Sequence, residues 1–168
     1  MKYIRLIIAA FLLAACSPKQ ETIDPGRYFT VQTLTHKAYL YYGLNEVNDR
    51  RVIENIMGVD PVETQWCAAF VNMVLSREGL PTSASVSNYP LTARSFLKLG
   101  EEVKEPREGD IIIFPRGSQG WQGHVGFYVS TTYVDEVKYY NILGGNQSDS
   151  VNIEQYPARS VLGIRRIW

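Results

Sequence analysis

The chain has 168 residues, of which 45% are hydrophobic and 20% are charged, with 17 basic against 17 acidic side chains. This length and composition are those of one globular domain with short additions. No excess of positive charge points to a nucleic-acid partner. No repeat with a period of about 20–50 residues and no low-complexity tract is visible, which argues against solenoid and array folds.

The first 15 residues are typical of an export signal. Lys2 and Arg5 give a positive start, and the apolar run at 7–15 is too short to span a bilayer. The run ends in Leu-Ala-Ala-Cys at 13–16, which resembles the lipobox of a bacterial lipoprotein, and this resemblance implies that Cys16 is lipidated and begins the mature chain. The alternative is an ordinary signal peptide cleaved after Ala15.

A lipid on Cys16 implies a membrane anchor rather than a membrane span. Loss of residues 1–15 removes two basic residues and no acidic one, so the mature chain has a net charge of −2. By resemblance, Ser17 after the cysteine indicates delivery to the outer membrane of a Gram-negative cell. We therefore expect a protein lipid-anchored outside the cytoplasmic membrane and facing the periplasm, with a tether at 16–27 and one domain at 28–168.

The domain begins with helical patterns and continues with strand patterns. Helices are predicted at 34–44, 49–57, 64–78 and 91–99, each followed or ended by a glycine. Strands are predicted at 111–114, 123–129, 137–143, 151–155 and 161–167, and the first is a continuous apolar run typical of a buried strand. This order predicts an α+β domain in which an antiparallel sheet packs against the cysteine-bearing helix.

Cys67 lies in the first turn of the helix predicted at 64–78, with Thr64 as its N-cap. Lowering the pKa of a thiol by two units takes about 2.7 kcal/mol. A helix N-terminus supplies about 0.3–1 kcal/mol, so a thiolate here also needs a histidinium nearby. The alternative is that Cys67 is a small core residue. A single thiol left in an export compartment, where cysteines usually pair, favours a reactive one.

His124 is the candidate partner of that cysteine. It begins a predicted strand after a glycine-rich loop, whereas His36 lies among polar residues and is expected at the surface. Asn146 follows two glycines at the end of the next strand and can hold the imidazole tautomer, as in papain-like Cys-His-Asn sites. The alternatives are a strand histidine bound to a local carbonyl and an asparagine in a hairpin turn. The order of the three residues favours a catalytic set.

Four blocks of sequence occur in a fixed order: TQWCAAFVN at 64–72, PREGDI at 106–111, GHVGF at 123–127 and LGGNQ at 143–147. Together they resemble the CHAP superfamily of cysteine, histidine-dependent amidohydrolases and peptidases, which is related to the NlpC-like cell-wall peptidases. The resemblance covers about residues 39–167 and implies a papain-like core. Many members carry a glutamate two residues before the asparagine. Here Gly144 stands in that place, so the orienting role would rest on Asn146 alone.

The resemblance also implies a reaction and a set of site residues. Cys67, His124 and Asn146 would cleave an amide bond of peptidoglycan stem peptides through a thioacyl intermediate, with no cofactor. The oxyanion would be stabilised by the backbone N–H of Cys67 and by Gln65. The residues expected to line the cleft are Trp66, Trp121 and Tyr89. Glu46 lies in a segment similar to a family element but has no assigned role, and an unidentified protein regulator is a possible further partner.

Other kinds of site fit the sequence poorly. One cysteine and two distant histidines form no metal-ligand set, and the chain contains neither a Gly-x-Ser-x-Gly elbow nor a phosphate-binding Gly-Lys-Ser/Thr loop. Two alternatives to the hydrolase stay open. One is a non-catalytic lipoprotein that binds peptidoglycan or a protein, and the other is a related acyltransferase or thioesterase. The scissile bond could be the N-acetylmuramoyl-L-alanine amide, a stem-peptide bond or a cross-bridge bond.

Overall fold

The computed structural model describes residues 33–167. The expected signal at 1–15, Cys16, the tether at 16–27 and the start of the domain at 28 all lie outside the described residues. Within the described part, no helix is long and apolar enough to cross a membrane.

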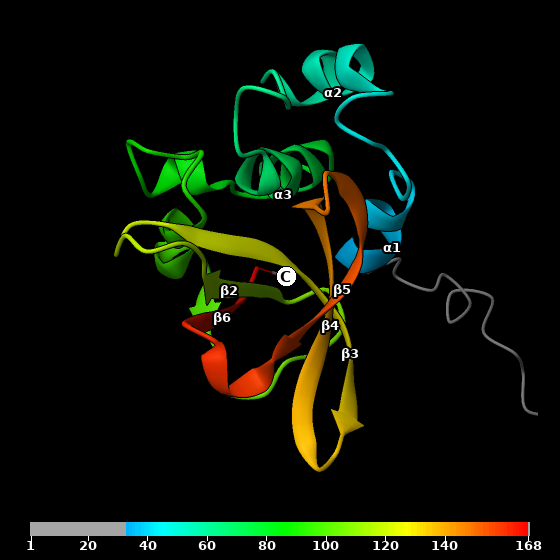
Figure 1. Ribbon diagram of the computed structural model, residues 1–168. Coiled ribbons are helices and arrows are strands. Elements are labelled where there is room, and N and C mark those ends of the chain that lie inside the picture. The colour runs from blue at the N-terminus through cyan, green and yellow to red at the C-terminus, as the bar shows by residue number, and fades with distance from the viewer. Residues whose placement is uncertain (1–32, 168) are drawn as a thin grey trace, which may run out of the picture. The chain divides into compact units, whose positions relative to one another are not determined.

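The described residues form an α+β fold, with helices first and strands second (Figure 1). The helices are α1 (Leu34–Tyr39), α2 (Arg50–Met57) and α3 (Cys67–Arg77), followed by the 3₁₀ helices η2 (Ser83–Ser85) and η3 (Ala93–Lys98). The strands are β1 (Glu101–Glu102), β2 (Ile111–Pro115), β3 (Gly123–Val134), β4 (Val137–Gln147), β5 (Ser150–Pro157) and β6 (Gly163–Arg166), with η4 (Ala158–Ser160) before the last.

The six strands form one antiparallel sheet in the order β1-β6-β2-β3-β4-β5. Two-residue turns join β3 to β4 and β4 to β5. The central residues of these turns, Asp135 and Glu136 in one and Ser148 and Asp149 in the other, all have positive φ. Such backbone matches the right-handed twist of the paired strands. The expected antiparallel sheet is therefore confirmed.

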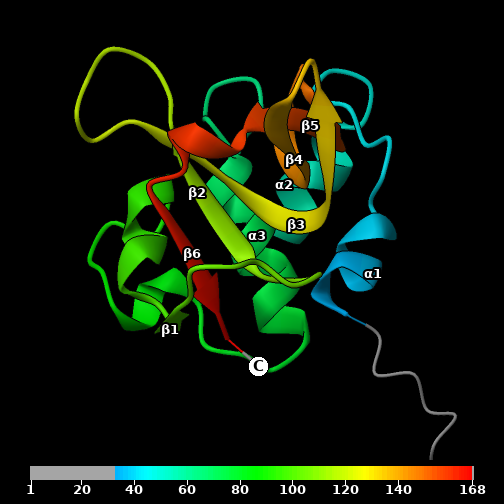
Figure 2. The same cartoon turned by 90° about the horizontal axis from the view of Figure 1, so that it is seen from below.

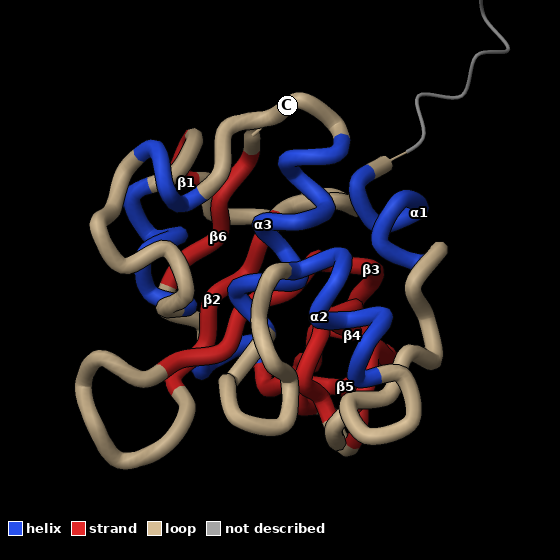
Figure 3. Tube along the Cα trace, turned by 90° about the horizontal axis from the view of Figure 1, so that it is seen from above, coloured by secondary structure: helices blue, strands red, loops and turns tan. Residues whose placement is uncertain are grey.

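The continuous apolar sequence of strand β2 is accounted for by the burial of both faces of the strand. Ile111 and Ile113 pack in the core that includes α3, while Ile112 and Phe114 pack in a second core on the other face. Figure 2 shows β6, β2 and β3 with α3 behind them, and Figure 3 shows α3 and α2 in front of the strands from the opposite side. The fully buried strand read from the run at 111–114 is confirmed.

Several predicted boundaries differ from the structure. The N-cap predicted at Thr64 is wrong, because α3 begins at Cys67 and Trp66 occupies the N-cap position. Thr64 lies in the preceding turn, where its backbone N–H donates to the Asp60 carbonyl at 2.9 Å. The predicted helix at 91–99 is the 3₁₀ helix η3. Helix α1 ends at Tyr39, and turns carry the chain on to Gly43. Helices α2 and α3 are followed by Gly58 and Gly79 with φ of 71° and 67°, as the sequence predicts.

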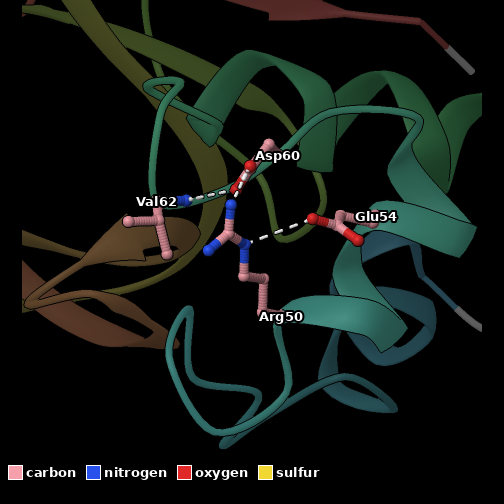
Figure 4. A network of polar contacts seen from close by, with 4 residues as sticks. All are labelled: Arg50, Glu54, Asp60 and Val62. Carbon is pink, nitrogen blue, oxygen red and sulfur yellow. Dashed lines mark hydrogen bonds and ion pairs between the residues drawn. The ribbon is translucent and has the colours of Figure 1, made fainter.

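A polar network fixes the segment that leads into α3 (Figure 4). Arg50, the first residue of α2, forms an ion pair with Asp60, and its Nε donates to Glu54 Oε1 at 3.2 Å. Arg50 pairs with Asp60 Oδ2, and the second carboxylate oxygen, Oδ1, accepts from the backbone N–H of Val62 at 3.1 Å. Because this segment continues directly to Gln65, the network ties the start of the cysteine-bearing helix to α2.

Candidate active site

Cys67 opens α3 and lies at the wall of a cavity of about 320 Å³. The residue is 3% exposed and its thiol is free. The cavity is also lined by Gln65, Trp121, Arg116 and the segment 91–93. The volume is that of a small-ligand site. The structure thus brings the predicted cleft residues Gln65 and Trp121 together with Cys67, while Tyr89 lines a neighbouring cavity that shares Trp121.

Trp66 was expected to line the cleft, and this expectation is wrong. Its side chain is fully buried, and its indole Nε1 donates to Glu46 Oε2 at 3.2 Å. A Cβ added at Gly145 would lie 2.6 Å from the Trp66 ring, so only glycine lets β4 approach so closely. Trp66 therefore packs between the start of α3 and β4. Glu46 has a structural role, because it accepts the hydrogen bond of the Trp66 indole.

The orienting contact to His124 comes from Gln147, not from Asn146. His124 is fully buried, and its Nε2 lies 2.8 Å from Gln147 Oε1. The pairing of β4 with β5 shifts register between Gly144 and Gln147, and Asn146 has a φ of 56°. This bulge interrupts the strict alternation of side chains along β4. Because of this irregularity, the side chain of Gln147 contacts His124, and not that of Asn146, which the sequence predicts.

Asn146 nonetheless belongs to the neighbourhood of the site. Its carbonyl oxygen accepts a hydrogen bond from Arg116 Nη2 at 3.1 Å, and its side-chain Nδ2 is buried without a partner among the described residues. It lies in the last part of β4 rather than in the hairpin turn, which is formed by Ser148 and Asp149. The alternative of a turn asparagine is therefore also wrong.

The hydrogen bonds of Gln147 fix the tautomer of His124. The Gln147 Nε2 group donates to the carbonyl oxygens of Ile142 and Asn152 at 3.1 and 2.7 Å, and Asn152 Oδ1 lies 2.9 Å from it. With the amide nitrogen committed to oxygen acceptors, Oε1 must face the imidazole as an acceptor. His124 Nε2 therefore carries the proton. The other ring nitrogen, Nδ1, has no hydrogen-bond partner in the described part of the chain and holds a free lone pair.

Burial keeps both His124 and Cys67 neutral. Burial, with a smaller contribution from the Arg116 cation, lowers the pKa of His124 to about 3, while the hydrogen bond with Gln147 acts in the opposite direction. Burial also raises the pKa of the Cys67 thiol, against the pull of Arg116 and of nearby backbone amides, including that of Val125. The thiolate and histidinium expected at rest are thus replaced by a neutral pair. Transfer of one proton between them would create an ion pair with no net charge.

Two observations place Cys67 and His124 in the same neighbourhood, although no hydrogen bond joins them. The backbone N–H of Val125, the residue after His124, acts on the Cys67 sulfur. The ring of Tyr156 stacks on the imidazole with centroids 5.2 Å apart. Burial raises the pKa of Tyr156, the Glu154 carboxylate raises it further, and deprotonation of the Cys67 thiol would add to this rise. The two candidate catalytic groups therefore share both Val125 and Tyr156 as neighbours.

Sequence reasoning missed Gln147, Arg116 and Tyr156. The first two had a usable signal: Gln147 directly follows the asparagine of the LGGNQ block, and Arg116 comes immediately after the buried strand β2, at the start of a loop. Tyr156 lies on β5, far along the sequence, and only strand pairing brings it to the imidazole. His36 is exposed on α1, as expected. Residues 33–167 contain no group of three or more His, Cys, Asp or Glu side chains placed to hold a metal ion.

Comparison of the sequence with protein-family models gives no match, and comparison with curated proteins gives none either.

Proposed function

We propose that this protein is a cysteine amidohydrolase or peptidase of the CHAP type, with a papain-like core, and that it cleaves an amide bond of peptidoglycan. One observation carries the proposal. A buried imidazole is held by Gln147 with its Nδ1 lone pair free, close to a free thiol that opens a helix beside a cavity. A nucleophile, a base and a group that orients the base are the parts that covalent acyl transfer requires.

The chemistry starts from the neutral pair. His124 Nδ1 takes the thiol proton as the Cys67 sulfur attacks the amide carbonyl carbon, and Gln147 Oε1 stabilises the imidazolium through Nε2–H. The oxyanion lies near the backbone N–H groups at the start of α3, with Gln65 as a side-chain donor. His124 then gives its proton to the leaving nitrogen, and a thioester remains. Water, deprotonated by the same imidazole, releases the acyl group and restores the thiol.

The substrate class and location rest on the sequence. The resemblance to cell-wall hydrolases and the export signal make peptidoglycan stem peptides the first substrate to test. Lipidation of Cys16 would hold the enzyme at the outer membrane, facing that substrate in the periplasm. A protein regulator that restrains the activity is part of the same proposal.

Digestion of purified sacculi tests the proposal. Protein of residues 17–168 is incubated with sacculi beside its Cys67→Ala and Cys67→Ser variants, and the released fragments are identified by mass spectrometry. The proposal predicts new fragments with the wild type only, and their masses name the bond that is cut. No fragments from a folded wild-type protein would favour a binding lipoprotein or an enzyme with another acyl substrate.

A further inference from the structure

Arg116 is a cation placed at the reactive end of the cavity. It follows β2 directly and lines the cavity together with Cys67 and Gln65. Its charge opposes the burial that raises the pKa of Cys67 and adds to the burial that lowers the pKa of His124, so it acts on both groups of the proposed pair. Its position is held by the hydrogen bond from Nη2 to the carbonyl of Asn146, which fixes the guanidinium without neutralising it.

No acidic side chain neutralises Arg116. Among residues 33–167 it forms no ion pair, and its bond to Asn146 uses one of the five N–H donors of a guanidinium. Neither the Cys67 cavity nor its neighbour is lined by an Asp or Glu. The neighbouring cavity instead adds Arg94 and Lys98. The surface that a substrate meets on this side of Cys67 is therefore positive, although the mature chain as a whole is expected to be slightly negative.

We propose that Arg116 binds a carboxylate of the substrate next to the bond that Cys67 attacks. The enzyme would then prefer acyl donors with a free carboxylate over the same donors with that carboxylate amidated. The inference rests on the proposed function, because it takes the cavity beside Cys67 as the active site. A guanidinium suits this task, because it binds a carboxylate through paired, charge-assisted hydrogen bonds that an amide of the same shape cannot replace.

Arg116 could instead serve only to stabilise negative charge on the sulfur, and a matched pair of reagents separates the two roles. Iodoacetate and iodoacetamide both alkylate a thiolate: the sulfur–carbon bond forms, the carbon–iodine bond breaks and iodide leaves. They differ in whether the attached group is a carboxylate or an amide. Because both reactions use the same thiolate, the ratio of their rates is independent of how much thiolate is present. The ratio therefore reports recognition of the carboxylate alone.

The experiment measures both rates at Cys67 in the full chain purified in detergent, with labelling read from the mass of the peptide that contains Cys67. For the wild type, the iodoacetate-to-iodoacetamide ratio should exceed that of free cysteine. Arg116→Gln should lower it by about tenfold or more, the size expected for one charge-assisted hydrogen bond. The control Lys98→Gln removes the same charge from the neighbouring cavity and should leave most of the ratio intact.

Other outcomes overturn the inference. If Arg116→Gln slows both reagents equally, Arg116 acts on the sulfur and does not select carboxylates. If Lys98→Gln lowers the ratio as much as Arg116→Gln, the preference for iodoacetate comes from the summed positive charge of the two cavities and not from a contact with Arg116.

A binding measurement decides the matter if neither reagent reaches Cys67. Cys67→Ala protein is titrated with N-acetylglycine and with N-acetylglycinamide, and the NMR signal of the backbone amide of Gly123, which lines the same cavity, is followed. The inference predicts a shift with the acid alone that disappears in the Cys67→Ala/Arg116→Gln protein, and equal responses to both compounds would contradict it. Neither readout depends on hydrolysis of sacculi, so a failure of the proposed function is seen separately.

Discussion

Replacement of His124 by glutamine should make the protein more resistant to acid. In the folded state the pKa of His124 is lowered to about 3, mainly by burial, whereas in the unfolded chain it returns to about 6.5. Between these two values the unfolded state binds a proton that the folded state does not. The free energy of unfolding therefore falls as the pH falls from 6.5 towards 3.

The size of the effect follows from the shift. Each pH unit within this window removes about 1.4 kcal/mol, so the His124 contribution costs about 2 kcal/mol at pH 5 relative to pH 7. The difference reaches about 4 kcal/mol at pH 3 and approaches about 5 kcal/mol below it, as large as the whole stability of some small domains. The carboxyl groups of the protein add their own pH dependence. For this reason the wild type must be compared with a variant that lacks only this imidazole.

Urea unfolding of the wild type, His124→Gln and His36→Gln at several pH values between 7 and 4 measures the effect. His124→Gln should lose about 2 kcal/mol less than the wild type between pH 7 and pH 5, whatever its stability at pH 7. His36→Gln, which removes the exposed histidine of α1, should follow the wild type. If His124→Gln and the wild type lose the same stability over this range, His124 is not held neutral by burial and the proposed base is wrong.

Two further changes test the parts that support the site. Gln147→Ala should lower the rate of any Cys67-dependent reaction by about 10²-fold, because it frees the His124 ring to rotate. Asn146→Ala should lower this rate clearly less. Steady-state kinetics compare the two variants, and a larger loss of rate in Asn146→Ala would refute the assignment of Gln147. Gly145→Ala should lower the free energy of unfolding by about 1–3 kcal/mol, because its Cβ would overlap the Trp66 ring, and thermal unfolding that leaves the midpoint unchanged would contradict this packing.

Much of the fold could be predicted from sequence because it depends on local patterns. The apolar run at 111–114 predicts a strand buried on both faces, and the structure shows its side chains alternating between two cores. Gly58 and Gly79 end helices because a left-handed residue there caps the last turn. The start of α3 was missed by three residues, since the turn around Asp60 takes up the backbone N–H of Thr64.

The site was harder to predict because it depends on contacts between distant segments. The sequence identifies Cys67 and His124, but a choice between Asn146 and Gln147 requires the bulge at the end of β4, which period-two reasoning cannot reveal. The burial of a side chain also depends on contacts between distant segments. The helix N-terminus predicts a thiol of lowered pKa at Cys67, whereas the surrounding core raises it. Likewise, Trp66 has the sequence neighbours of a cleft residue and the burial of a core residue.

The proposed chemistry depends on the position of one proton, and NMR of ¹⁵N-histidine-labelled protein locates it directly. The chain has only two histidines, so the His36→Gln variant assigns both pairs of ring signals. We predict that at neutral pH and down to about pH 5 the His124 ring stays neutral, with its proton on Nε2 bound to Gln147 and Nδ1 bare. A ring protonated on both nitrogens at neutral pH, or a proton on Nδ1, would contradict the assignment of His124 as the base for Cys67.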